Sequence, residues 1–371
     1  MKTAQDWCRL ANEDDVPSPA LLIFPDRVEE NLRRMVAIAG GPERLRPHVK
    51  THKLPQIVAL ELAHGITRFK AATIAESEMC AAAGAPDVLL AYPLVGPNVR
   101  RLVELVRKFP VTKFSALADN LASVAALNSA AAAGGVKLRV LLDLNVGMNR
   151  TGVAPGPAAE GIYRAIVHSP ELEPGGLHAY DGHLHDTNRA RIASDHHHAF
   201  AAVWALRDRL IAAQLPVPVI VAGGTPTFPL FADHPEVELS AGTTVLWDFG
   251  QSDTTPYVDL LHAAVLLTRV ISRPTENRVC LDLGHKAVAS EMPHPRVKLF
   301  GLEDATFVMH SEEHLVVETP RANEFPVGTV IYGLPRHVCP TVALHSEVIV
   351  VRQGRAVERW PVTARARRIS L

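Results

Sequence analysis

The feature that most constrains the fold is a regular alternation of short apolar runs with helix-like segments between residues 19 and 245. Eight runs are predicted to be strands, because each is short, apolar and bounded by proline, glycine or polar residues. They are residues 20–24, 45–50, 68–71, 87–90, 113–116, 137–143, 174–179 and 218–221. Helical spacing of apolar residues predicts helices at residues 26–39, 74–83, 96–109, 120–133, 157–168 and 196–213. This alternation predicts an α/β fold built on a parallel (β/α)8 TIM-like barrel.

Beyond residue 250 the pattern changes to alternating β-type runs separated by glycine and proline turns. The runs are residues 265–271, 278–283, 314–318, 329–332 and 347–351. A chain of 371 residues is long enough for two domains. We therefore predict a barrel domain at residues 17–249 and a C-terminal all-β domain at residues 250–371, which residues 1–16 complete.

Charge and hydropathy argue against two classes of partner. The chain has 38 basic and 39 acidic residues without a long run of either sign, so neither nucleic acid nor a membrane surface is expected. No apolar stretch reaches the ~20 residues that span a bilayer, and residues 1–12 lack the apolar core of a signal peptide. We therefore expect a cytoplasmic protein. Four cysteines without a framework spacing argue against disulfides and leave a metal or buried-thiol role open.

Residues 46–53, with the sequence RPHVKTHK, place two lysines at the end of a predicted barrel strand. Active sites of such barrels lie at the C-terminal ends of the strands, so Lys50 and Lys53 are candidates for a Schiff-base nucleophile. A nucleophilic lysine must be neutral, which requires burial or neighbouring cations to lower its pKa from about 10.4. Arg46 and the two histidines of the segment are candidates for those cations. The alternative is that both lysines are solvated residues of a loop.

Two turns rich in small residues follow the last predicted barrel strand. Gly223, Gly224 and Thr225 begin the sequence GGTPT, whose backbone N–H groups and threonine hydroxyls can hold a phosphate. A second turn, at residues 240–244, has the sequence SAGTT. A glycine-rich loop is often only a turn, but phosphate sites of barrels cluster after the late strands. The first turn is therefore the predicted phosphate site.

Residues 180–186 concentrate titratable groups at the end of another predicted strand. Histidine has the near-neutral pKa that proton abstraction requires, so one of His183 and His185 is predicted to face the site and the other to be structural. We assign the base to His183 and a cofactor contact to His185. Tyr180 is a candidate for stacking on a ring or hydrogen bonding near it.

His337 and Cys339 lie two residues apart in a segment predicted to be extended. Alternate residues of a strand point to the same face, so the imidazole and the thiolate can bind one metal ion. Two side chains do not complete a metal site, and a buried cysteine is common. A thiolate ligand favours zinc over the harder manganese and magnesium ions.

Several of these motifs occur in the order of a known family. RPHVKTHK, residues 72–76 (ATIAE), the segment 143–152 with Arg150, GGTPT and residues 337–341 (HVCPT) resemble the alanine-racemase-like barrel enzymes that use pyridoxal phosphate (PLP). The resemblance is to their D-threonine aldolase and D-serine dehydratase branch. It implies that Lys50 carries PLP and that Arg150 lies beside the phenolic oxygen of the cofactor. It also implies that Gly242 and Thr243 contact the phosphate.

The resemblance further implies a PLP-dependent and divalent-metal-dependent lyase of the D-threonine aldolase type, with zinc or manganese on His337 and Cys339. Its substrate would be a small β-hydroxy-D-amino acid, cleaved to glycine and an aldehyde. Residues 282–286 and 311–314 resemble the aldolase-like members, whereas HVCPT is the form of the zinc-bearing D-serine dehydratases. A D-serine or 3-hydroxyaspartate dehydratase is therefore the alternative, followed by an amino-acid racemase or a non-catalytic PLP carrier. In related enzymes the β domain of a second subunit approaches the barrel mouth, so the resemblance predicts a homodimer.

Overall fold

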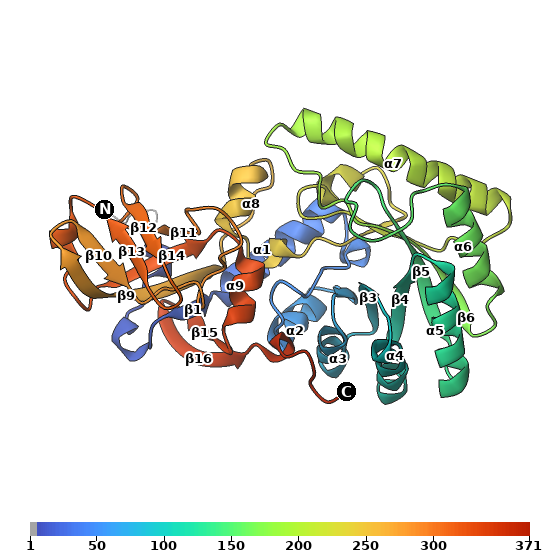
Figure 1. The fold of residues 1–371 in the computed structure, drawn as a ribbon, viewed down its shortest axis with the longest axis horizontal. Coiled ribbons are helices and arrows are strands. Elements are labelled where there is room, and N and C mark those ends of the chain that lie inside the picture. Colours follow the sequence, from blue (N-terminus) through green and yellow to red (C-terminus); the bar gives the residue numbers. More distant parts are fainter. Residues whose placement is uncertain (1–5) are drawn as a thin grey trace. The chain divides into compact units, whose positions relative to one another are not determined.

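A computed structural model describes residues 6–371, in which the strands form one seven-stranded and one nine-stranded sheet (Figure 1). The chain divides into two compact units. The first, here called the barrel unit, comprises residues 33–50, 54–242 and 366–371. The second, the β unit, comprises the chain up to Leu32, residues 51–53 and residues 243–365. Within the described range, no helix is both long enough and apolar enough to cross a membrane.

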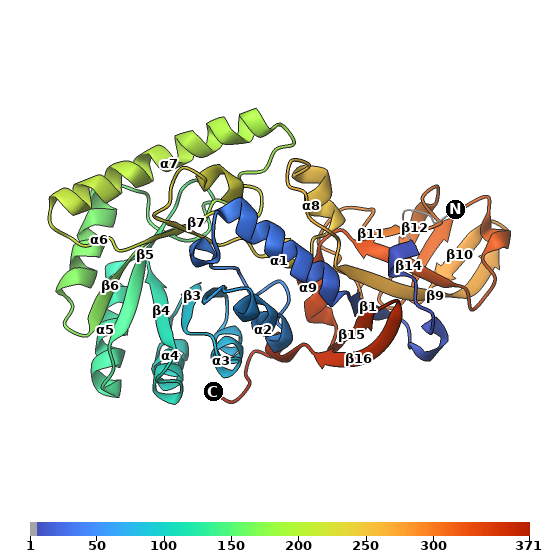
Figure 2. The ribbon, with the colours of Figure 1, turned by 180° about the vertical axis from the view of Figure 1, so that it is seen from behind.

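The seven-stranded sheet belongs to the barrel unit, and all of its neighbouring strands are parallel. In chain order the strands are β2 (Arg68–Ala71), β3 (Asp87–Pro93), β4 (Lys113–Ala118), β5 (Leu138–Leu144), β6 (Leu172–Ala179), β7 (Ile220–Ala222) and β8 (Val237–Leu239). The connecting helices are α2 (Pro55–Ala63), α3 (Ile74–Ala82), α4 (Pro97–Lys108), α5 (Leu121–Gly134), α6 (Pro157–His168) and α7 (Arg189–Ala212). Figures 1 and 2 show helices α3 to α6 outside the strands. This arrangement confirms the predicted TIM-like barrel.

The segment around Arg46 closes the ring between β8 and β2. Leu45 bridges Leu239 and His48 bridges Lys70, both in parallel orientation. The N–H of Arg46 donates to the Leu239 carbonyl at 2.8 Å. Because Pro47 has no N–H to donate, the segment forms isolated bridges rather than a continuous strand. The predicted strand 45–50 therefore occupies the eighth position of the ring in irregular form.

The prediction of the first barrel strand was wrong in its pairing. Residues 20–24 contain strand β1 (Ala20–Ile23), but β1 pairs with β9 (Ala264–Thr275) and β15 (Glu347–Arg352) in the nine-stranded sheet. All four residues of β1 are buried. A fully buried apolar run can belong to either sheet, so the sequence alone does not show which sheet the strand joins. Strand β8 was not predicted, because it is only three residues long and has Glu238 at its centre.

Helices α3 to α6 lie where the apolar periodicity predicted them, and so does α1 (Pro25–Ala39). Helix α7 begins earlier than predicted, because the Asn188 side chain accepts hydrogen bonds from the N–H groups of Ala190 and Arg191. Residues 72–76 form the start of α3. The Thr73 hydroxyl accepts from the Glu76 N–H at 3.0 Å, and the Glu76 carboxylate accepts from the Ala72 N–H at 2.6 Å. This reciprocal pair is a variant of the capping box, so the segment fixes a helix start.

The barrel interior is arranged in layers that follow the two-residue period of the strands. The lowest layer is charged and contains Arg46, Asp87, Arg139 and Glu238. Leucines of β3, β4 and β5 fill the next layer with Val221. Beyond this apolar layer, in the direction of the chain, the strands reach their C-terminal ends. The apolar layer therefore separates the charged layer from the polar groups at the barrel mouth.

The nine-stranded sheet belongs to the β unit and is mostly antiparallel. Besides β1, β9 and β15 it contains β10 (Arg278–Leu281), β11 (Val297–Leu299), β12 (Thr306–His310), β13 (Leu315–Glu318), β14 (Val330–Pro335) and β16 (Arg355–Pro361). This sheet confirms the predicted C-terminal β domain, to which two short helices that were not predicted, α8 (Phe249–Thr254) and α9 (Val338–Leu344), are added. Single 3-10 turns occur at Asp6–Cys8, Glu13–Asp15, Pro42–Arg44, Phe228–Phe231, Thr243–Val245, Ala322–Glu324 and Thr363–Arg365.

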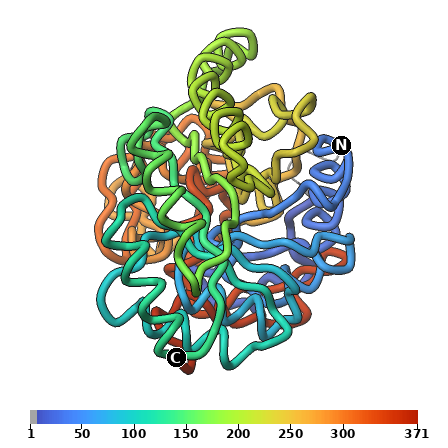
Figure 3. The backbone as a smooth tube through the Cα atoms, turned by 90° about the vertical axis from the view of Figure 1, so that its right-hand side faces the viewer, coloured from blue at the N-terminus to red at the C-terminus, as the bar shows by residue number. Residues whose placement is uncertain are grey.

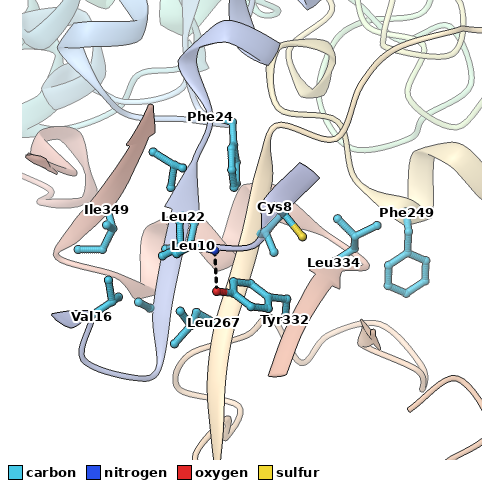
Figure 4. Packing of buried hydrophobic residues seen from close by; sticks show 13 residues of the cluster. Cys8, Leu10, Val16, Leu22, Phe24, Phe249, Leu267, Tyr332, Leu334 and Ile349 are labelled. Carbon is cyan, nitrogen blue, oxygen red and sulfur yellow. Dashed lines mark hydrogen bonds between the residues drawn. The ribbon is translucent and has the colours of Figure 1, made fainter. Parts of the chain in front are cut away.

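The core of the β unit includes residues from both ends of the chain. Figure 4 shows Cys8 and Leu22 packed with Leu267, Tyr332 and Ile349. The Tyr332 hydroxyl accepts a hydrogen bond from the backbone N–H of residue 10 at 3.1 Å. Burying each large apolar side chain contributes about 1.5–3 kcal/mol, so the N-terminal segment is an integral part of this core.

The end of the chain returns to the barrel unit and lies beside helices α3 and α4 (Figures 1 and 3). Arg101 of α4 donates to the Leu371 carbonyl at 2.8 Å. The Ser370 N–H donates to the Glu78 carboxylate of α3 at 3.2 Å. The last residues are thus held by side chains of two barrel helices.

Candidate active site

Three cationic side chains surround the ring of Tyr180 in the barrel unit. The Nζ atoms of Lys50 and Lys70 lie 5.8 Å and 5.4 Å from the ring centroid, and Cζ of Arg150 lies 4.6 Å from it. Tyr180 directly follows β6, Lys70 is near the end of β2, and Arg150 lies in the loop after β5. The C-terminal ends of parallel barrel strands meet at one mouth, which explains why these residues converge. The structure thus brings together three residues singled out from the sequence, Lys50, Arg150 and Tyr180.

Lys70 was not identified from the sequence, although it lies at the centre of this cluster. Its side chain is buried, and its Nζ donates to the Ser240 hydroxyl at 3.0 Å. Burial is the main cause that lowers the pKa of Lys70 to about 7, and Lys50 lowers it further. The available signal was a lysine at an inward position near the end of the apolar strand RFKA.

Arg46 does not act as one of the predicted cations near Lys50. Its guanidinium forms ion pairs with Asp87 at 2.7 Å and with Glu238 at 2.5 Å in the lowest barrel layer. These carboxylates offset its charge. His48 is buried, and its Nδ1 accepts the backbone N–H of Lys50 at 3.3 Å, so it positions the lysine backbone.

A buried histidine and aspartate pair lies across β5 and β6. Asp143 and His178 are register partners, and Oδ1 of Asp143 lies 2.6 Å from Nδ1 of His178. Burial and the nearby Lys70 lower the pKa of His178 and outweigh the effect of Asp143. Burial alone would raise the pKa of Asp143, but its hydrogen bonds with His178 and Thr151 keep it below the usual value. Nε2 of His178 is buried and has no hydrogen-bond partner.

The predicted phosphate turn is held by an internal hydrogen-bond network. The N–H of Gly224 donates to Asp181 Oδ1 at 2.8 Å and to Thr227 Oγ1 at 2.9 Å. Gly223 has φ of +79°, a left-handed conformation that favours glycine. The N–H of Gly224 is therefore already used within the turn. Thr225 and Gly242 are buried in the same unit, whereas Thr243 belongs to the β unit.

The two candidate base histidines differ in their surroundings. His183 is half-buried and packs against Gly147, where an added Cβ would lie 2.6 Å from its Nε2. Its Nδ1 is buried without a hydrogen-bond partner. His185, by contrast, is exposed. The imidazole of His183 is thus the more enclosed of the two.

His337 and Cys339 do not lie on an extended strand, so that prediction was wrong. His337 immediately precedes α9, and Cys339 lies in its first turn. The Asp248 carboxylate accepts the Val338 N–H at 2.8 Å, and Pro340 fits a first turn because no donor is needed there. These two features start a helix where the sequence suggested a strand.

The two side chains nevertheless lie together. The Cys339 sulfur is within hydrogen-bonding reach of the His337 ring, and it lies 3.2 Å from the Thr51 hydroxyl. Nδ1 of His337 lies 2.5 Å from a carboxylate oxygen of Glu291. Burial would lower the pKa of His337, but the Cys339 sulfur and Glu291 outweigh it and raise this pKa to about 9.

The donor atoms present fit an exchangeable metal ion better than a closed metal site. Imidazole nitrogen and thiolate sulfur are donors that suit zinc. Across residues 6–371, no group of three or more histidine, cysteine, aspartate or glutamate side chains is arranged to hold a metal. An ion on His337 and Cys339 would therefore keep positions open for water or substrate. The metal site stays a prediction.

The barrel cluster fits PLP in its chemistry. A lysine amine, an aromatic ring and an arginine meet at the barrel mouth, and small residues follow β7 and β8. A lysine can hold the cofactor aldehyde, and an aromatic face can pack against its ring. The roles of the individual residues stay predictions.

Comparisons with known proteins agree with this chemistry. Two family models match: "Alanine racemase, N-terminal domain" over residues 23–245 and "Putative serine dehydratase domain" over residues 263–351. The chain is 30% identical to D-threonine aldolase from Arthrobacter sp., over 94% of this chain and 93% of that protein. It is 27% identical to D-threo-3-hydroxyaspartate dehydratase from Delftia sp. (strain HT23), over 92% of this chain and 96% of that protein.

A solved structure shows the same fold. D-threonine aldolase from Filomicrobium marinum matches with a TM-score of 0.87 and 28% identity, over 95% of this chain and 96% of that chain. The relatives named here are lyases that differ in the bond they break. The chain therefore belongs to the alanine-racemase-like family of PLP enzymes, in the branch that contains the D-threonine aldolases and D-serine dehydratases.

Proposed function

We propose that this chain is a PLP- and divalent-metal-dependent lyase of the D-threonine aldolase type, which cleaves β-hydroxy-D-amino acids to glycine and an aldehyde. The observation that carries this proposal is the cluster of Lys50, Arg150 and Tyr180 at the mouth of the barrel. The 30% identity to a D-threonine aldolase over nearly the whole chain supports the choice of reaction.

In this proposal Lys50 holds PLP, Tyr180 packs against the cofactor ring and Arg150 lies at its phenolic oxygen. Backbone N–H groups after β7 and β8, from Gly223, Thr225, Gly242 and Thr243, would hold the phosphate, and His185 would contact the cofactor. The N–H of Gly224 instead keeps the first turn in shape through Asp181 and Thr227. When bound, PLP supplies an electron sink for the electron pair of a bond at the substrate α-carbon.

His183 is the proposed base, which accepts the proton of the substrate β-hydroxyl. Loss of that proton would allow the bond between the α- and β-carbons to break and the aldehyde to leave, and return of the proton to the α-carbon would complete glycine. His337 and Cys339 would hold zinc or manganese, a Lewis acid that polarises the hydroxyl oxygen.

The second candidate is a dehydratase acting on D-serine or 3-hydroxyaspartate. Cys339 favours it, because a thiolate in this motif is the zinc-bearing form of the dehydratases that the sequence resembles. In this reaction Lys50 would take the α-proton and the β-hydroxyl would leave as water. Racemase and carrier functions rank below both, since neither uses the histidine and cysteine motif. The same resemblance supports a homodimer, which light scattering of the purified protein tests.

Product analysis with D-threonine, D-serine and D-threo-3-hydroxyaspartate separates the candidates. Glycine with an aldehyde supports the aldolase, whereas 2-oxobutyrate, pyruvate or oxaloacetate supports the dehydratase. The cofactor assignment is tested by the visible absorbance band of lysine-bound PLP, which Lys50→Ala should lose and the matched control Lys53→Ala should keep. Persistence of the band in Lys50→Ala would contradict the assignment.

A further inference from the structure

Residues 287–291 of the β unit run along helix α9 and contact it at regular intervals. Nε2 of His345, at the end of the helix, donates to the Ala287 carbonyl at 2.8 Å. The N–H of Ala289 donates to the hydroxyl of Thr341, in the middle of the helix, at 3.1 Å. The segment is therefore fastened to α9 at two successive turns.

A third contact continues this spacing and ends at the predicted metal motif. Nδ1 of His337, the residue before α9, lies 2.5 Å from a carboxylate oxygen of Glu291. The three partners on the helix side are four residues apart and share one face, whereas those of the segment are two residues apart. Four helical residues rise about 6 Å and two extended residues span about 6.6 Å, so the two spacings match. The position of Glu291 thus follows from the same register as the two contacts before it.

The segment begins at residues 282–286, one of the two motifs that resemble the aldolase-like members. The N–H of Lys286 donates to the Glu312 carbonyl at 3.0 Å. A Cβ added at Gly284 would lie 2.0 Å from the same carbonyl oxygen, so the two chains approach as closely as glycine permits. Residues 282–286 are therefore anchored on the second motif, residues 311–314, and together they hold the start of the segment.

The backbone on either side of His337 is held independently of this segment. The Val338 N–H donates to the Asp248 carboxylate at 2.8 Å, and the Arg336 carbonyl accepts a backbone N–H of α8 at 3.1 Å. The side chain of His337 is nevertheless 40% exposed, so packing alone does not fix the rotation of its ring. The hydrogen bond to Glu291 supplies the missing constraint.

We propose that Glu291 is a positioning residue that selects the metal-binding nitrogen of His337. The proposal rests on the proposed function, in which His337 and Cys339 hold a divalent metal. When the Nδ1–H of the ring donates to Glu291, Nε2 keeps the lone pair that a metal ion needs. The Cys339 sulfur is within hydrogen-bonding reach of the same ring, so this nitrogen and the sulfur can share one ion. Glu291 touches neither the ion nor the substrate.

The test measures the zinc affinity of PLP-loaded protein from which the metal has been removed, by titration against a chromophoric chelator. Glu291→Met cannot accept the Nδ1–H, so zinc binding should weaken about 10–100-fold, the typical effect of losing such a partner. Glu291→Gln keeps a carbonyl oxygen as acceptor and should lose less than about 10-fold. Titration at about pH 9.5 limits competition from protons, because the pKa of His337 is about 9.

Glu358→Met is the matched control and should keep the zinc affinity of the wild type. Glu358 lies on β16, pairs with Arg352 at 3.6 Å and is 46% exposed, against 47% for Glu291. Wild-type affinity in Glu291→Met, a Glu291→Gln as weak as Glu291→Met, or equal weakening in Glu358→Met would each overturn the proposal. Failure of the proposed metal site has a different signature, because the wild type would then bind zinc no better than His337→Ala. That result would remove the site and this proposal together.

Discussion

Replacing Arg46 with methionine should destabilise the barrel unit, because it removes a buried positive charge from between two carboxylates. Arg46 is 1% exposed and lies 2.7 Å from Asp87 and 2.5 Å from Glu238. Removing one partner of a buried ion pair typically costs about 3–5 kcal/mol. Here Asp87 keeps Arg139 at 2.7 Å, and Glu238 keeps Arg68 at 3.3 Å. These remaining arginines place the expected loss at the lower end, about 3 kcal/mol.

The pH dependence of this loss follows from Asp87. Burial would raise the pKa of its carboxyl group, but Arg46 and Arg139 hold it below the usual value. A carboxylate with a lowered folded-state pKa contributes stability above its unfolded pKa of about 3.9, and the contribution disappears as the pH falls through the folded pKa. The difference between wild type and Arg46→Met should therefore be constant at neutral pH and narrow below about pH 4.

Urea unfolding followed by far-ultraviolet circular dichroism measures this difference. Arg164→Met is the matched control, because Arg164 pairs with Glu160 on the surface of α6 and is 44% exposed. Exposed pairs contribute less than about 1 kcal/mol, so the control should unfold close to the wild type. A loss below about 1 kcal/mol in Arg46→Met, or a difference that persists unchanged at acid pH, would refute the reasoning.

Three further predictions concern the backbone, the base and the metal. Gly176→Ala should destabilise the protein by at least about 2 kcal/mol, because Gly176 has φ of +101° and an added Cβ would lie 2.0 Å from the Val219 carbonyl oxygen. Gly161→Ala, in open space on α6, should leave the thermal midpoint unchanged or raised. His183→Asn should abolish turnover while the PLP absorbance band remains; wild-type turnover in this variant would contradict the choice of base. Treatment with a chelator should stop turnover reversibly without loss of the band, and full activity of metal-free protein would remove the metal from the mechanism.

Local sequence patterns were sufficient to predict most helices and strands of the barrel. Helix α6 lies at the predicted residues because Pro157 suits a first helical turn and the following apolar residues recur at helical spacing. Strand β1 was found but assigned to the wrong sheet, because its partner strands are remote in the chain. Strand β8 was missed because Glu238 interrupts its apolar character, and its Arg46 partner lies far away in the chain.

The candidate site shows the same division between local and distant causes. Lys50 and Tyr180 follow apolar segments that mark strand ends, so their position at the mouth was predictable. Lys70 was overlooked because its burial depends on Ser240 and on the neighbouring strands, not on its own segment. The helix that begins beside His337 depends on a cap from Asp248, which the residues around Cys339 do not reveal.

The pairing of β1 has a consequence for how the chain folds as it is synthesised. Leu22 pairs with Ile349, so β1 can form this pairing only after β15, near the end of the sequence, has been synthesised. The central stretch of the barrel unit, from residue 54 to residue 242, is continuous and can fold earlier. A fragment that ends near residue 249 would carry β1 without β9 and β15, and its unpaired apolar edge would favour aggregation. The N-terminal strand therefore makes folding of the β unit dependent on synthesis of the chain through β9 and β15.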